Sequence, residues 1–73
     1  MQNKGNKGKV KKSEVKCYDH NGTELNVNDS VMFAKGKMEL EGVISILLPN
    51  NKLIMNSEQG SLTVNAIDTY YVP

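Results

Sequence analysis

Short alternating segments broken by turn residues are the feature that most constrains how this chain can fold. Val31 and Phe33 flank a methionine, which is the two-residue period of a strand with one buried face. Gly36 then stands where a tight turn needs a positive φ. Gly42 stands where a bend, or a close approach of two backbones, excludes a side chain. The stretch 29–44 therefore predicts a strand, a tight turn and a second strand that is entered through a glycine.

The rest of the chain repeats this arrangement of short apolar segments and turns. Asn and Gly tolerate a positive φ and Pro favours turns, so clusters of these residues mark the chain reversals. Turns are expected at Asn21-Gly22, Asn28-Asp29, Gly36-Lys37, 49–51 and 57–60. Strands are expected near 15–18, 25–27, 31–33, 38–48, 53–55, 62–64 and 70–72.

The spacing of these segments predicts the fold class. Within 38–48, Ile44, Ile46 and Leu48 are expected to share one face of a strand that Gly42 bends. Residues 65–69 predict a single helical turn, and no segment predicts a helix of ten residues. The prediction is an all-β fold, a small barrel of five to six short antiparallel strands with one helical turn before the last strand.

The length and the single cysteine limit the kind of protein this can be. The 73 residues allow one small domain, predicted at 15–73. Cys17 has no second cysteine to pair with, which favours a reducing compartment. No apolar run approaches the roughly 20 residues of a membrane-spanning helix, and the start of the chain does not have the pattern of a signal peptide. We expect a cytoplasmic protein without membrane contact.

The charge is divided unevenly along the chain. Residues 1–16 carry six lysines against Glu14 alone, whereas residues 17–73 carry three lysines against seven acids, and the chain contains no arginine. Residues 1–14 are too polar to bury a core, so they predict a disordered, Lys-rich tail ahead of an acidic domain. Flexible lysines can contact phosphates without reading a base sequence. The six lysines are Lys4, Lys7, Lys9, Lys11, Lys12 and Lys16.

The central motif resembles the KOW motif of small SH3-like barrels, as in NusG-type transcription factors and some ribosomal proteins. The residues that carry the resemblance are Asp29, Val31, Phe33, Gly36, Gly42, Val43 and Ile44. It implies an SH3-like barrel over 15–73 and a nucleic-acid or ribonucleoprotein partner in transcription or translation. Where the family often has Gly before the Asp, this chain has Asn28, which also tolerates the left-handed region.

Residues with catalytic or metal-binding chemistry are sparse. Cys17 and His20 have a C-x-x-H spacing, but a structural metal site needs four Cys or His ligands and the chain has no others. A half-buried thiol and a turn histidine are the expected outcome. Glu39 and Glu41 are expected on the solvent face of a strand, and no phosphate-binding glycine loop is present. We predict a protein that is not an enzyme and needs no cofactor or metal.

Two functional hypotheses remain open. In the first, a non-catalytic module binds nucleic acid or a ribonucleoprotein assembly, with the six lysines attracting phosphate and Lys35, Lys37 and Tyr71 contacting the partner at the barrel. In the second, the acidic barrel is a protein-interaction module or a small phage-type accessory or inhibitor protein. Exposed Met32, Met38 and Tyr71 would then meet the protein partner. Neither hypothesis fixes an oligomeric state.

Overall fold

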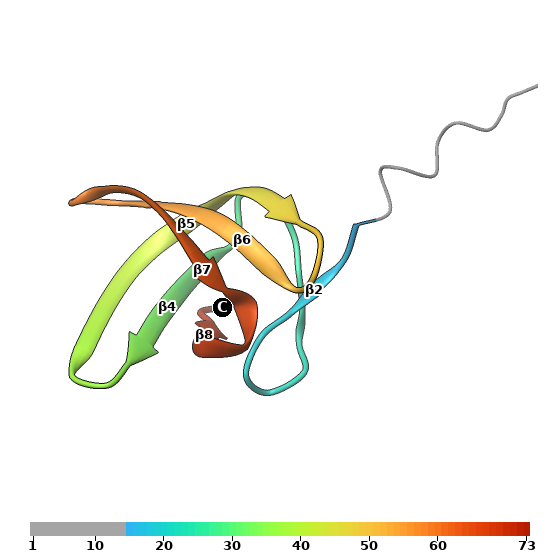
Figure 1. Ribbon diagram of the computed structural model, residues 1–73, viewed down its shortest axis with the longest axis horizontal. Coiled ribbons are helices and arrows are strands. Elements are labelled where there is room, and N and C mark those ends of the chain that lie inside the picture. Colours follow the sequence, from blue (N-terminus) through green and yellow to red (C-terminus); the bar gives the residue numbers. More distant parts are fainter. Residues whose placement is uncertain (1–14) are drawn as a thin grey trace, which may run out of the picture.

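The computed structural model describes residues 15–73, which form an all-β structure (Figure 1). The main sheet has five antiparallel strands in the spatial order β7-β6-β5-β4-β8, and β2 and β3 form a separate antiparallel pair. Its strands are β4 (Ser30–Lys35), β5 (Met38–Leu48), β6 (Lys52–Ser57), β7 (Gly60–Asn65) and β8 (Thr69–Tyr71). The short pair comprises β2 (Cys17–Tyr18) and β3 (Glu24–Leu25). The tail predicted at 1–14 lies outside the described residues.

One turn of 3-10 helix, η2 (Ala66–Asp68), connects β7 to β8. The Thr69 hydroxyl donates a hydrogen bond to the Ala66 carbonyl at 2.7 Å, and the Ala66 N–H donates to the Asn51 carbonyl at 2.8 Å, so both ends of the turn are tied down. The predicted all-β class, the antiparallel pairing and the helical turn before the last strand are confirmed. Within residues 15–73 no ladder joins β7 to β8, so the main sheet has two edges.

The β4–β5 hairpin forms as the sequence predicts. Gly36 has a φ of 63°, the left-handed region that favours glycine, and the strands pair on either side of it with Lys35 opposite Met38. Asn28 takes the same region with a φ of 80°, as expected of an asparagine at a turn. In Figure 1 this hairpin and the β2–β3 pair lie on opposite sides of the molecule.

Gly42 marks a close approach between β5 and β6. It lies opposite Val31 on one side and Ser57 on the other. A Cβ atom at Gly42 would collide with the backbone carbonyl of Asn56 and would lie 2.7 Å from Cε of Met55. The space beside this residue is therefore filled by backbone, which confirms the predicted exclusion of a side chain.

A β-bulge in β5 corrects the predicted facing of its apolar residues. The β5–β6 register shifts between Ile44 and Ile46, so that Ser45 is an extra residue on β5. One extra residue reverses the alternation: Ile44 is buried, whereas Ile46 is 48% exposed. Leu47 packs against the core in its place. The prediction that Ile44, Ile46 and Leu48 share one face was wrong.

The core fills the concave side of the main sheet. The two-stranded sheet and η2 complete it, because Cys17, Leu25 and Ala66 are fully buried. The thiol of Cys17 reaches the carbonyl of Lys52 at 3.1 Å, which ties β2 to the start of β6. The buried apolar residues are Cys17, Leu25, Val31, Phe33, Ile44, Leu53, Met55, Val64 and Ala66.

Candidate binding groove

The β8 edge of the main sheet is covered by the loop between β2 and β3. The His20 N–H donates a hydrogen bond to the Thr69 carbonyl at 2.8 Å. The Tyr71 N–H donates to Oδ2 of Asp19, also at 2.8 Å. The outward carbonyl of Thr69 and the outward N–H of Tyr71 are thus bonded within the chain, and the loop occupies the place that a further strand would take beside β8.

Asp19 is the residue that holds this loop in place. Its side chain is only 2% exposed, and its Oδ1 accepts hydrogen bonds from the N–H groups of Asn21 at 2.9 Å and Thr23 at 2.8 Å. Burial by itself raises the pKa of this carboxyl, but the bonds from Tyr71, Thr23 and Asn21 outweigh it, and the pKa lies below its ordinary value. Asp19 is therefore an ionised, buried acceptor at neutral pH.

The β7 edge has no such cover among the described residues, since β7 pairs only with β6. A two-residue turn connects the two strands, with Ser57 opposite Gly60. In such a hairpin the main-chain N–H and C=O groups of the even-numbered residues of β7 point toward β6. The Ala66 N–H, which bonds to the carbonyl of Asn51 just before β6, continues that alternation. The N–H and C=O groups of Ser61 and Thr63 and the N–H of Asn65 therefore point to the open edge, whereas the Asn65 carbonyl is at the N-cap of η2 and accepts the first bond of that turn.

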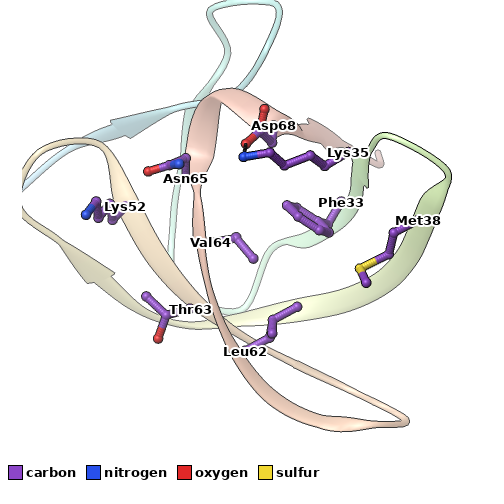
Figure 2. Close-up of a pocket in the computed structure, with 9 residues that line it drawn as sticks. All are labelled: Phe33, Lys35, Met38, Lys52, Leu62, Thr63, Val64, Asn65 and Asp68. Atoms are coloured by element: carbon purple, nitrogen blue, oxygen red, sulfur yellow. Dashed lines mark ion pairs between the residues drawn. The ribbon is translucent and has the colours of Figure 1, made fainter.

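A groove with a volume of about 400 Å³ runs beside this edge (Figure 2). It lies between β7, η2 and the β4–β5 hairpin, and it is open to solvent. The apolar side chains that line it are Phe33, Met38, Leu62 and Val64. The polar and charged residues that line it are Lys35, Lys52, Thr63, Asn65 and Asp68.

The charges around the groove are arranged at two places. Lys35 Nζ lies 3.7 Å from Oδ2 of Asp68, but the Lys35 side chain is 65% exposed, so this pair stabilises the fold little. Lys52, on β6, lies at the other side of the groove beside Asn65, its register partner on β7 (Figure 2). The groove thus holds two cations and one anion within an acidic domain.

The structure brings together only some of the residues predicted for a site. Lys35 and Met38 both line the groove, and Met38 is 55% exposed. Lys37 is exposed in the turn between them. Tyr71 is also exposed, but it pairs with Val31, four residues along β4 from Lys35, which is about 13 Å at the usual rise of a strand. Tyr71 therefore does not line the groove that Lys35 and Met38 line.

The other predicted site residues lie away from the groove. Met32 is half-buried and is paired with Tyr70 and Glu41, so it is less exposed than its alternation predicts. Lys16 is exposed in a shallow depression lined by β3. Lys4, Lys7, Lys9, Lys11 and Lys12 lie outside the described residues.

Cys17 and His20 do not form a joint site. Cys17 is fully buried rather than half-buried, because its thiol lies against the Lys52 and Leu48 carbonyls, and burial raises its pKa above the ordinary value. The exposed His20 ring stacks against Tyr70, with ring centres 4.9 Å apart. In the described part of the chain no group of three or more His, Cys, Asp or Glu could hold a metal ion.

No protein-family model, curated protein or solved structure gives a significant match to this chain. Within residues 15–73, no helix has the length and apolar character needed to cross a membrane. The function is therefore argued from the geometry of the two edges and the groove.

Proposed function

We propose that this protein is a non-catalytic interaction module that binds a segment of another protein in the groove beside β7. The observation that carries the proposal is the position of the groove: an apolar surface lies open next to a strand on which the outward main-chain groups of Ser61 and Thr63 have no strand partner among residues 15–73. Apolar surface supplies affinity for a partner, and free main-chain groups supply orientation.

We further propose that the domain is an SH3-like barrel of the KOW type. The strand order of the main sheet and the helical turn before β8 support this assignment. The positive φ of Gly36 and the crowding at Gly42 support it at the motif itself. The KOW resemblance implies the fold of a binding module, and we assign the groove as the surface at which this module binds its partner.

Nucleic-acid binding is the second candidate, and one observation favours it. Residues 1–16 carry six lysines against one acid. Residues 15–73, in contrast, carry four lysines against seven acids, and Glu39, Glu41 and Glu58 gather beside one depression of their surface. An acidic domain repels a polyanion, so this function would depend on the lysines of the first 16 residues.

A titration of the full chain separates the two candidates. The wild type and a variant with all six lysines of residues 1–16 changed to glutamine are titrated with single-stranded RNA and duplex DNA at two salt concentrations. A displayed library of random ten-residue peptides is selected against both proteins. We expect peptides that bind the two proteins equally well. Salt-dependent nucleic-acid binding that the glutamine variant loses, together with no selected peptide, would favour the second candidate instead.

A pair of matched substitutions locates the peptide site. Met38→Asn changes an exposed apolar side chain in the groove, and Ile46→Asn makes a similar change at a similarly exposed position outside it. We expect Met38→Asn to weaken a selected peptide about fivefold, because it removes apolar contact area, and Ile46→Asn to leave its affinity unchanged. Equal effects of the two changes would exclude the groove.

A further inference from the structure

We propose that the partner segment binds by adding a strand to the free edge of β7, and that it carries a carboxylate next to Lys52. This inference rests on the proposed function and deepens it, because it states how the segment is held and what chemistry it has. The occupant is a single extended segment of another protein, with apolar side chains at alternate positions.

The main chain of β7 fits this mode of binding. Ser61 and Thr63 each direct one donor and one acceptor to the open edge, and Asn65 adds a third donor, at the two-residue spacing at which a neighbouring strand offers its own groups. The strand Gly60–Asn65 contains no proline and no charged residue, the two features that most often protect an edge. The edge at β8 is by comparison already bonded through Asp19 and His20.

The side chains of the groove supply the specificity for alternate apolar residues. Leu62 and Val64 face the concave side of the sheet from β7 itself, and Phe33 and Met38 face them from the β4–β5 hairpin (Figure 2). Every second side chain of an added strand points to that same side. Those side chains would enter the groove, while the ones between them would remain in solvent.

The charges along β7 set the polarity of the segment. Lys52 lies opposite Asn65 at one end of the strand, whereas Glu58 lies in the turn at the other end, close to Glu39 and Glu41. A carboxylate is therefore attracted at the Asn65 end and repelled at the Ser61 end. Of the two lysines that line the groove, Lys35 already lies beside the carboxylate of Asp68, so we assign Lys52 to the carboxylate of the partner.

The shape of the groove favours one strand over a second copy of this chain. Its far wall consists of η2 and the β4–β5 hairpin of the same chain, so the space beside β7 is about 400 Å³. A single extended segment enters such a space. A second folded domain would meet the far wall, and the six-residue edge offers little of the roughly 1,200 Å² that a stable dimer buries.

The experiment uses the full chain and a synthetic ten-residue peptide that alternates valine with threonine and carries two glutamates at one end. Two N-methylated forms are compared with it, each methylated at alternate residues along one of its two edges. Only one edge can face β7, so we expect one form to bind at least tenfold more weakly and the other to bind like the parent. Equal binding of all three peptides would overturn strand addition, and if Met38→Asn still weakened them the proposed function would stand.

Amide exchange of the protein locates the added strand. With the peptide bound, exchange at Ser61, Thr63 and Asn65 is expected to slow by about tenfold or more, while Leu62 and Val64, which already face β6, change little. Protection of the three outward amides that appears without peptide and grows with protein concentration would show that a second copy occupies the edge, and it would overturn the assigned partner.

Two substitutions complete the test. Thr63→Pro removes an outward donor at a position where an edge strand tolerates proline, so we expect at least tenfold weaker peptide binding, while the amides of Val31 and Ile44 still exchange slowly.

Lys52→Glu is expected to lower the affinity for the glutamate peptide about threefold and to raise the affinity for a peptide with lysines in place of the glutamates. Lys16→Glu, the same charge change outside the groove, should change neither affinity. Equal effects of the two charge changes would exclude the assigned carboxylate site.

Discussion

The two edges of the main sheet differ in how their outward main-chain groups are satisfied. At β8 a buried carboxylate, Asp19, and the N–H of His20 bond the strand from outside. At β7 the outward groups of Ser61 and Thr63 and the N–H of Asn65 lie beside a partly apolar groove. Both are edges of one small sheet, so the difference is not a consequence of strand pairing. It shows that one edge is closed by a specific contact and that the other is available for a partner.

The largest expected effect is at Gly42, because both edges depend on the curvature of β5 and β6. Gly42→Val places a side chain against the Asn56 carbonyl, and we expect a loss of about 3 kcal/mol in the free energy of unfolding. Denaturant unfolding measures it. Stability within about 0.5 kcal/mol of the wild type would mean that β6 can move away without cost.

The next effect tests the closed edge alone. Asp19→Asn removes the charge that accepts three main-chain hydrogen bonds, and we expect a loss of about 2 kcal/mol. Amide exchange should quicken at Tyr71 and Thr23 more than at Leu62 or Val64. If β7 were to open as much as β8, the comparison between the edges would fail, because Asp19 would then stabilise the whole sheet rather than one side.

Acid provides a reversible form of the same test. The folded pKa of Asp19 lies below its ordinary value of 3.8, so its stabilisation is complete above that value and is lost as the pH falls through the lower folded pKa. Between about pH 5 and pH 2 the wild type should lose more stability than Asp19→Asn, whose side chain does not titrate. Thermal unfolding at several pH values measures this, and parallel curves would contradict the assignment.

The smallest effect on stability is expected at the open edge. Thr63→Lys adds a charge at an exposed position of β7. The free energy of unfolding should therefore change by no more than about 0.5 kcal/mol. Binding of the glutamate peptide still requires the Thr63 main chain, which lysine retains. The variant therefore tests the comparison: light scattering at high concentration should be the same for the variant and the wild type, because the far wall of the groove keeps a second copy from this edge. Weaker scattering from the variant would contradict that.

The strands and turns could be predicted because their signals are local. Val31, Phe33 and Gly36 lie within six residues of each other, and the alternation and the turn are both visible there. The bulge at Ser45 could not be predicted in the same way, because alternation shows that two faces exist but not where an extra residue exchanges them. The expected position of Ile46 was wrong for that reason.

The candidate site was only partly predictable. Met38 and Lys35 were expected to contact a partner, and both line the groove. Lys52 and Asp68 were missed because they join the groove through tertiary packing and belong to no motif. The cover on β8 was also missed, because Asp19 and Tyr71 are 52 residues apart in the sequence. The absence of charge and proline in 60–65 was the one sequence signal for an open edge.

The buried thiol of Cys17 allows partial opening of the fold to be measured directly. It is the only cysteine, it is fully buried, and the β2–β3 pair that carries it closes one end of the core. A thiol-reactive dye can label it only when β2 lifts from the carbonyls of Lys52 and Leu48. The labelling rate therefore follows the opening of this one corner, in protein of unchanged sequence.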